Sequence, residues 1–303
     1  MGEDRRVNRL FCFGLGFSAE ALARRLAAKG WSIAGTARDP ANIERIRGQG
    51  YEVCRFAGEP GNAELLAALA GTTHLLHSIP PGAEGDPVLR HYRAEIARLP
   101  TLEWIGYLST VGVYGNHKGA VVDEAAMPRP HNERTKARVV AESGWLAFGE
   151  EIGRPVQVFR LAGIYGPGRS ALDKLRAGTA RRIVKPGQVF NRIHVEDIAS
   201  VLEASMARPR AGAIYNVADD EPAPPEDVIA YGAELLGIEP PPEVPFEEAD
   251  LTPMARSFYG DTRRISNTLI KSELGVRLAY PNYREGLKAL IDADRPAKRT
   301  SPQ

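Results

Sequence analysis

The stretch Arg9-Leu10-Phe11-Cys12-Phe13-Gly14-Leu15-Gly16-Phe17-Ser18-Ala19 decides the fold of this chain. An apolar run of strand length leads into two closely spaced glycines, and residues 18–29 follow with apolar side chains at helical spacing. Gly30 marks the end of that helix. A strand, a glycine turn and a helix in this order predict the first half of a βαβ unit.

The alternation of strand and helix continues along the chain. Further strands are expected at residues 31–37, 51–56, 73–79, 104–109 and 156–161, and further helices at residues 63–70, 88–98 and 139–148. Strands that alternate with helices form parallel sheets. The predicted fold class is therefore α/β, a doubly wound parallel sheet of the Rossmann type with a small C-terminal substrate-binding portion.

The domain organisation follows from where this pattern holds. Residues 1–168 are expected to form the dinucleotide-binding domain, and residues 189–220 are expected to return to it. Beyond Gly168 the pattern loosens, and residues 221–253 are rich in proline. Residues 169–188 and 221–303 are therefore predicted to form mostly the smaller C-terminal substrate-binding portion.

Composition indicates which kinds of partner and which compartment to expect. The chain has 303 residues and a formal net charge of +1, without the concentrated basic face that nucleic acid or a membrane surface requires. A small-molecule ligand is expected instead. The N-terminal stretch 1–10 lacks the long apolar core of a signal peptide, and no segment is long enough to span a bilayer. Cys12 and Cys54 lie in apolar strands, which predicts buried thiols and a cytoplasmic protein.

The glycine turn has the form of a dinucleotide-binding fingerprint. Gly14 permits a tight turn, and Gly16 allows backbone amides to approach a pyrophosphate. Ala19 lets the helix pack closely on the strand, while the helix N-terminus attracts the anion. We expect Gly14, Gly16, Phe17, Ser18 and Ala19 to bind the cofactor; the alternative is a glycine turn without a ligand.

The end of the second strand indicates which dinucleotide is preferred. A protein selective for NAD usually carries an acid there, to bind the ribose hydroxyls. The segment reads Ala34-Gly35-Thr36-Ala37-Arg38, so a 2′-phosphate would meet a guanidinium. NADP(H) is therefore favoured over NAD(H). In the alternative interpretation, Arg38 is a solvated surface residue and Asp39 takes the place of the acid.

Further motifs follow in a characteristic order. They are Leu108-Ser109-Thr110-Val111-Gly112-Val113-Tyr114-Gly115, Val122-Asp123-Glu124, the stretch 160–168 (RLAGIYGPG), the stretch 193–199 (IHVEDIA) and Ile214-Tyr215-Asn216-Val217. With these motifs the chain resembles the extended, epimerase/dehydratase-like, short-chain dehydrogenase/reductase family. The resemblance implies a doubly wound sheet that carries the cofactor, and a small C-terminal portion that closes over a substrate, often a nucleotide sugar.

The same resemblance implies a serine or threonine, a tyrosine and a lysine as the reacting groups. Thr110, four residues before Tyr114, matches the first of them. The segment that should hold the other two, Pro130-His131-Asn132-Glu133-Arg134-Thr135-Lys136-Ala137-Arg138, contains no tyrosine. The chain therefore looks like the atypical subgroups of the family, and the usual proton transfer by tyrosine is not available to it.

Two registers of this segment against the family pattern remain open. With Pro130 and Glu142 as the flanking residues, Arg134 takes the tyrosine position and Arg138 the lysine position, which is the register we prefer. With Lys136 as the lysine, the tyrosine position falls on Asn132. Arginine stays protonated in proteins, so Arg134 cannot shuttle a proton, whereas Arg138 could still bond the cofactor ribose. The alternative is that these cations form a solvated helix face.

Two hypotheses for function follow. The first is an NADP-dependent oxidoreductase or epimerase-like enzyme that uses Thr110 and an unusual proton donor on a carbonyl or sugar-like substrate. The second is a non-catalytic module that senses the redox state of NADP(H) for a partner protein, as is thought of the tyrosine-lacking NmrA-like regulators. The resemblance also implies a homodimer, formed through two helices that would include residues 134–148.

Three histidines, His74, His77 and His194, are expected to have structural roles. His74 and His77 are three residues apart on a predicted strand, so they point to opposite faces and no metal site is expected. His194 and Asp197 are expected to fix a strand-to-helix turn rather than to perform chemistry.

Overall fold

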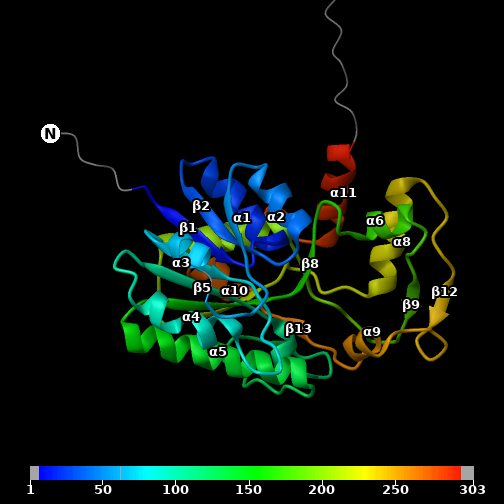
Figure 1. Ribbon diagram of the computed structural model, residues 1–303. Coiled ribbons are helices and arrows are strands. Elements are labelled where there is room, and N and C mark those ends of the chain that lie inside the picture. The colour runs from blue at the N-terminus through cyan, green and yellow to red at the C-terminus, as the bar shows by residue number, and fades with distance from the viewer. Residues whose placement is uncertain (1–6, 62, 295–303) are drawn as a thin grey trace, which may run out of the picture.

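The fold is seen in a computed structural model that describes residues 7–61 and 63–294. The outermost residues of the predicted domains, 1–6 and 295–303, therefore lie outside the described residues. A seven-stranded sheet has the order β11-β7-β5-β4-β1-β2-β3 (Figure 1). The strands are β1 (Arg9–Phe13), β2 (Ser32–Ala37), β3 (Glu52–Arg55), β4 (His74–His77), β5 (Trp104–Thr110), β7 (Val156–Leu161) and β11 (Ile214–Val217).

Every neighbouring pair in this sheet is parallel, which confirms the predicted doubly wound fold. The chain builds outward from β1 through β2 to β3, and then in the other direction through β4, β5, β7 and β11. The direction of winding reverses between β1 and β4. In such sheets the ligand binds at this switch point, in the crevice beyond the carboxyl ends of the strands.

Helices cover both faces of the sheet and enclose two apolar cores. One core includes side chains from α1 (Phe17–Ala27), α2 (Pro40–Arg47), α7 (Val195–Ala207) and α10 (Thr268–Ser272). The other includes side chains from α3 (Ala63–Leu69), α4 (Pro87–Ala97) and α5 (Glu133–Ile152). Each of these helices buries one face because its apolar residues recur at helical spacing.

The buried cysteines and the strand histidines lie as the sequence predicted. Cys12 and Cys54 are both buried free thiols. The ring of His74 contacts Trp31, whereas that of His77 contacts Trp145 on the opposite face. Among the described residues, no group of three or more histidine, cysteine, aspartate or glutamate side chains could hold a metal ion.

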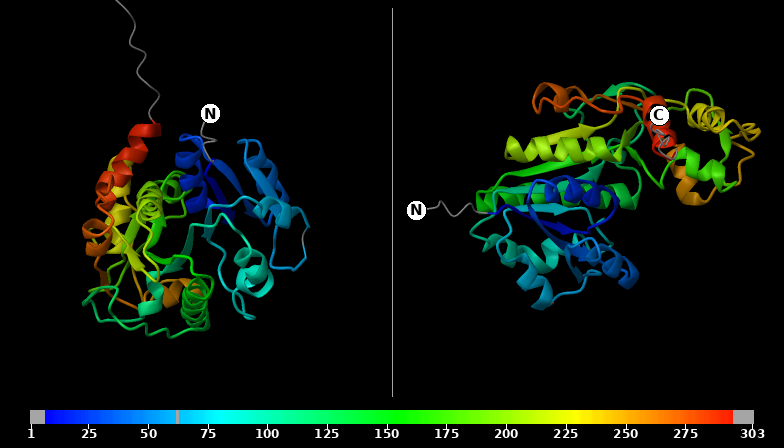
Figure 2. Two further views of the ribbon diagram at one scale, coloured as in Figure 1. Left: turned by 90° about the vertical axis from the view of Figure 1, so that its left-hand side faces the viewer. Right: turned by 90° about the horizontal axis from the view of Figure 1, so that it is seen from above.

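A smaller portion lies beyond one end of the strands (Figures 1 and 2). It contains α6 (Ala171–Arg176), α8 (Pro225–Leu236), α9 (Pro253–Phe258) and α11 (Tyr283–Asp294), together with β9 (Arg182–Val184) and β12 (Glu243–Pro245), which pair in parallel. Its own apolar cluster is built around Leu172, Val228, Tyr283 and Leu287. These elements come from the ranges 169–188 and 221–303.

Short strand pairs connect this portion to the main sheet. β8 (Gly163–Tyr165) pairs with β10 (Arg192–His194), and β6 (Val121–Val122) pairs with β13 (Arg264–Ile265). Beyond β13, the side chains of Ile270, Leu274 and Leu278 pack into the core of the main sheet. The residues after about 264 therefore return to the sheet before α11 rejoins the smaller portion.

The strand-to-helix turn at His194 is fixed as the sequence predicted. His194 is the N-cap of α7, and its Nδ1 accepts a hydrogen bond from the backbone N–H of Glu196 at 3.2 Å. Asp197 is fully buried and accepts the backbone N–H groups of Ala279 and Tyr280 at 2.7 and 3.0 Å. Both side chains are engaged in structure.

No helix among residues 7–61 and 63–294 combines the length and the apolar character needed to cross a membrane.

Candidate functional site

The glycine turn is fastened to the end of β2. Gly14 has φ +85°, a conformation that favours glycine, and a Cβ at this position would lie 2.7 Å from Ser78 Oγ. The backbone N–H of Gly14 donates to Thr36 Oγ1 at 2.9 Å, and that of Leu15 donates to the Thr36 carbonyl oxygen at 2.7 Å. The turn therefore holds the start of α1 directly beside the end of β2.

The N-terminus of α1 is open to an anion. Gly16 is the N-cap of α1, and no side chain caps this helix end. A Cβ on Gly16 would meet nothing within 4 Å, so there is free space in front of the first helical amides. Ala19, 1% exposed, packs into the core beneath them. Unpaired amides and the helix dipole attract phosphate, so this space fits the pyrophosphate of a dinucleotide.

Arg38 and Asp39 follow β2 beside this turn. Arg38 is exposed. The side chain of Asp39 is the N-cap of α2, and its Oδ1 accepts the backbone N–H of Asn42 at 3.1 Å. Part of the Asp39 carboxylate is thus used to cap a helix, whereas the guanidinium of Arg38 lies in solvent.

A cavity of about 1230 Å³ runs along the carboxyl edge of the sheet. Its wall includes Gly16, Ser78, Thr110 and Ala162, each at or just after the end of β1, β4, β5 or β7. The opposite wall comes from the smaller portion and includes Arg169, Lys174, Arg181, Arg192, Val228 and Tyr283. The cavity is large enough for a small molecule beside one half of a dinucleotide, because ligand pockets are typically about 300–1,000 Å³.

Thr110 lies at the point where β5 ends. It is the N-cap of the short helix η1 (Val111–Tyr114), and its Oγ1 accepts the backbone N–H of Gly112 at 3.1 Å. Its hydroxyl proton remains available to a ligand in the cavity. Tyr114 is fully buried and donates its hydroxyl to Asn216 Oδ1 at 2.8 Å, so it is not a substitute acid.

The two arginines of α5 line the cavity. Arg138 Nη1 donates to the Leu108 carbonyl oxygen at 2.7 Å and to the Tyr107 hydroxyl at 3.0 Å, which places its guanidinium beside the end of β5. Arg134 is exposed, and its guanidinium carbon lies 4.9 Å from the ring centroid of Phe258. Lys136 is exposed and pairs with Glu133. Arg138 lines the cavity and Lys136 does not, whereas both Arg134 and Asn132 line it.

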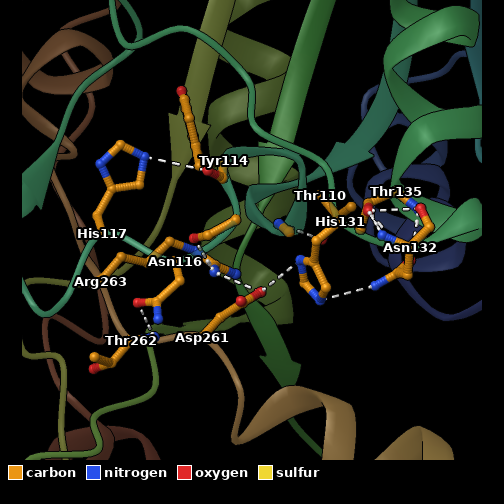
Figure 3. Close-up of polar contacts among 12 residues, drawn as sticks. Thr110, Tyr114, Asn116, His117, His131, Asn132, Thr135, Asp261, Thr262 and Arg263 are labelled. Atoms are coloured by element: carbon orange, nitrogen blue, oxygen red, sulfur yellow. Dashed lines mark hydrogen bonds and ion pairs between the residues drawn. The ribbon is translucent and has the colours of Figure 1, made fainter.

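A polar cluster at the cavity was not predicted (Figure 3). His131 Nδ1 lies 3.6 Å from Asp261 Oδ2, and Arg263 Nη1 lies 3.3 Å from the same oxygen. Asn132 Nδ2 lies 3.3 Å from His131 Nε2. His131, Asn132, Asp261 and Arg263 all line the cavity. Because His131 and Asp261 are far apart in the chain, no spacing in the sequence connects them.

Comparisons with known proteins bear on the fold and the family of the chain. No protein-family model matches the chain. The solved structure of a functionally unknown conserved protein from Silicibacter pomeroyi DSS is 55% identical, with a TM-score of 0.88 over 95% of this chain and 99% of that one. Protein YeeZ of Escherichia coli K12 is 28% identical over 281 residues, which cover 89% of this chain and 95% of YeeZ.

More distant structures share the fold. UDP-glucuronic acid 4-epimerase from Bacillus cereus, solved in complex with NAD, is 15% identical with a TM-score of 0.73, and the match covers 94% of this chain and 97% of that one. The chain belongs to the same family as the S. pomeroyi protein, and its fold is that of the extended, epimerase/dehydratase-like, short-chain dehydrogenase/reductases.

Proposed function

We propose that this protein binds NADP(H) at the glycine turn and acts as an oxidoreductase or epimerase-like enzyme on a carbonyl or sugar-like substrate. One observation carries the proposal: a single cavity joins the open N-terminus of α1 to Thr110 and to the two arginines of α5. A dinucleotide on the turn would extend from Gly16 toward these side chains. A substrate would then occupy the part of the cavity walled by the smaller portion.

NADP(H) is the proposed cofactor because of Arg38. This exposed cation follows the end of β2, which is bonded to the glycine turn through Thr36. A 2′-phosphate there gains a charge-assisted contact with the guanidinium. Asp39 is the competing candidate for the ribose, and its role as the cap of α2 leaves one carboxylate oxygen for that purpose.

The cations of the cavity favour a substrate that carries an anionic group. Arg169 lies 5.5 Å from the ring centroid of Phe17 and Arg134 lies 4.9 Å from that of Phe258, so each of these guanidinium groups faces a ring. Arg192 donates to the backbone carbonyl oxygens of Phe190 and Ala223. A phosphate or carboxylate would pair well with such groups. A sugar nucleotide, the substrate type named for the B. cereus epimerase, has this chemistry.

Each residue of the proposed site has a distinct role. Thr110 donates its hydroxyl to the substrate oxygen, and Arg138 bonds the ribose next to the nicotinamide. Arg134 keeps its proton and stabilises negative charge that develops on the substrate. Bound cofactor supplies or accepts the hydride.

A non-catalytic sensor of NADP(H) is the second candidate function. The observation that favours it is the pair Arg134 and Arg138, which line the cavity where the family pattern has tyrosine and lysine. Two permanent cations can hold a ligand without exchanging protons with it. Such a protein would bind one redox form preferentially and pass the difference to a partner.

A compartment and an oligomeric state are proposed for the protein as well. We propose a cytoplasmic protein, because two buried free thiols persist in a reducing environment. A homodimer is proposed as well, on the resemblance to the family, whose members pair through two helices that would include residues 134–148.

Turnover separates the two functions. Purified protein is mixed with NADPH and a panel of ketones, aldehydes and keto-sugar nucleotides, and the absorbance of NADPH is followed. Oxidation that depends on one substrate supports the enzyme. Preferential binding of NADPH or NADP⁺ without oxidation of NADPH by any substrate supports the sensor. If Arg134→Tyr with Arg138→Lys creates activity that the wild type lacks, the site is a decayed form of the family's usual one.

A further inference from the structure

We propose that His131, positioned by Asp261, is the acid and base that replaces the missing tyrosine. The inference rests on the enzymatic form of the proposed function and assigns its proton donor. The imidazole of His131 lines the same cavity as Thr110 and Arg138, and its side chain is 45% exposed. Histidine is suited to the task because its ordinary pKa lies near neutrality.

The N-cap of α5 fixes the proton on this imidazole. Asn132 caps α5, and its Oδ1 accepts the backbone N–H of Thr135 at 2.9 Å. This bond fixes the orientation of the amide, so its NH₂ group is the end that lies 3.3 Å from His131 Nε2. An NH₂ group only donates, so Nε2 of neutral His131 accepts and Nδ1 carries the proton.

Nδ1 of His131 faces a carboxylate. Asp261 Oδ2 lies 3.6 Å from it, a distance for an ion pair once the ring is protonated (Figure 3). The Asp261 side chain is only 13% exposed, so little solvent screens it. A carboxylate behind an imidazole orients the ring and stabilises the imidazolium, as an acid and base requires.

Two guanidinium groups that line the same cavity act against this stabilisation of the imidazolium, because like charges repel. Arg263 lies 3.3 Å from Asp261 Oδ2 and donates to the Gly115 carbonyl oxygen at 2.8 Å. Burial lowers the pKa of Arg263, and Asp261 acts against that shift. Arg134, from the first turn of α5, lines the cavity with them. Asp261 Oδ2 is thus shared between the His131 imidazole and the Arg263 guanidinium.

Hydride and proton are both accounted for, in reduction of a carbonyl and in oxidation of an alcohol. In reduction, the carbonyl carbon gains a hydride from the bound reduced cofactor, and the C=O double bond becomes a single bond. The carbonyl oxygen takes the proton from Nε2 of the imidazolium, which becomes neutral. In oxidation, neutral Nε2 removes the hydroxyl proton of an alcohol as the hydride leaves its carbon. Because Nε2 of the neutral ring accepts from Asn132, the imidazole has to move from Asn132 toward the substrate oxygen for either transfer.

Matched variants test the assignment. His131→Gln removes the titrating ring, Asp261→Asn removes the charge behind it, and His117→Gln is the control. His117 is also half-buried nearby, but its Nε2 bonds the Tyr114 carbonyl oxygen and it does not line the cavity. Turnover of the substrate found in the NADPH screen, its pH profile and calorimetric NADPH binding are measured for each variant.

We expect His131→Gln to lower turnover roughly 100- to 1,000-fold while NADPH binding stays within about twofold, since general acid catalysis contributes on this scale. We expect Asp261→Asn to lower kcat and to shift the pH profile of turnover toward lower pH, because the imidazolium loses the carboxylate that faces Nδ1. His117→Gln should change neither property.

Failure of this inference is distinguishable from failure of the proposed function. Full turnover by His131→Gln overturns the inference and leaves the enzyme intact. A pH profile of turnover that is unchanged in Asp261→Asn overturns the positioning role. If the wild-type protein binds NADPH but none of the substrates tested causes its oxidation, the enzymatic function is overturned. The role of His131 as proton donor is then overturned as well.

Discussion

Arg160 of β7 and Glu142 of α5 form an ion pair inside the core, with Nη2 and Oε2 2.7 Å apart and the two side chains 3% and 4% exposed. Ser109 of β5 donates its hydroxyl to the same carboxylate. The pair therefore fixes α5 against the ends of β5 and β7. This contact sets the position of the helix that carries Arg134 and Arg138 into the cavity.

Removal of the Glu142 carboxylate leaves the buried guanidinium of Arg160 without a counter-charge. We expect Glu142→Ala to lower the free energy of unfolding by about 3–5 kcal/mol, the usual cost of breaking a buried pair. Urea unfolding followed by circular dichroism measures the loss. Glu133→Ala, on the same helix but exposed, is the control and should cost no more than about 0.5 kcal/mol. Equal costs for the two variants would contradict the role given to the pair.

Two glycines of the same turn should respond differently to substitution. Gly14→Ala places a side chain at φ +85° and a Cβ 2.7 Å from Ser78 Oγ, so we expect it to cost at least about 1–3 kcal/mol of folding free energy. Gly16→Asp extends into open space at a helix N-cap, where aspartate is favoured, so stability should be retained. The same carboxylate would occupy the place of the pyrophosphate, so dinucleotide binding should be lost. Thermal unfolding and calorimetry measure the two effects, and a Gly16→Asp variant that still binds would rule out the turn as the site.

Arg38 should decide between the two dinucleotides. A charge-assisted hydrogen bond contributes about 1.5–3 kcal/mol, so Arg38→Ala should weaken NADPH binding roughly 10- to 100-fold. NADH has no 2′-phosphate, and its affinity should not change. The exposed position of Arg38 predicts an unchanged melting temperature. Equal loss of both dinucleotides, or of neither, would favour Asp39 as the residue that meets the ribose.

His194 should make the fold sensitive to acid. Burial lowers the pKa of this imidazole from 6.5 to about 4, so the folded state resists protonation where the unfolded chain accepts it. Stability should therefore be fully present above about pH 6.5 and decrease as the pH falls toward 4, by about 3 kcal/mol for this group. His194→Asn keeps an N-cap for α7 and does not titrate, so its loss of stability between these pH values should be smaller by that amount. Identical pH profiles of unfolding would contradict the assignment.

The sheet could be predicted from the sequence because its signals are local. Short local runs predict six of the seven strands of the main sheet, whereas β11 is marked only by a motif; the glycine turn between β1 and α1 has the spacing that a dinucleotide fold requires. The free, buried state of Cys12 and the opposed faces of His74 and His77 follow from the same strand pattern.

The rest of the site depends on contacts between distant segments. β13 returns to pair with β6, and the turn that follows α9 brings Asp261 to His131. These pairings have no periodicity and join loops of ordinary polar composition, so no pattern in the chain marks them. Arg263, Phe258 and the smaller portion's cations reach the cavity in the same way. The sequence therefore predicts the glycine turn after β1 better than it predicts the side chains that line the rest of the cavity.

Every function proposed for this protein requires an NADP(H) site at the N-terminus of α1. Calorimetric titration of the wild type and of Gly16→Asp with NADP⁺, NADPH, NAD⁺ and NADH measures whether that site exists. We expect the wild type to bind NADP⁺ or NADPH more tightly than NAD⁺ or NADH, and Gly16→Asp to bind none of the four while remaining folded. A folded wild-type protein that binds none of the four dinucleotides would rule out the site.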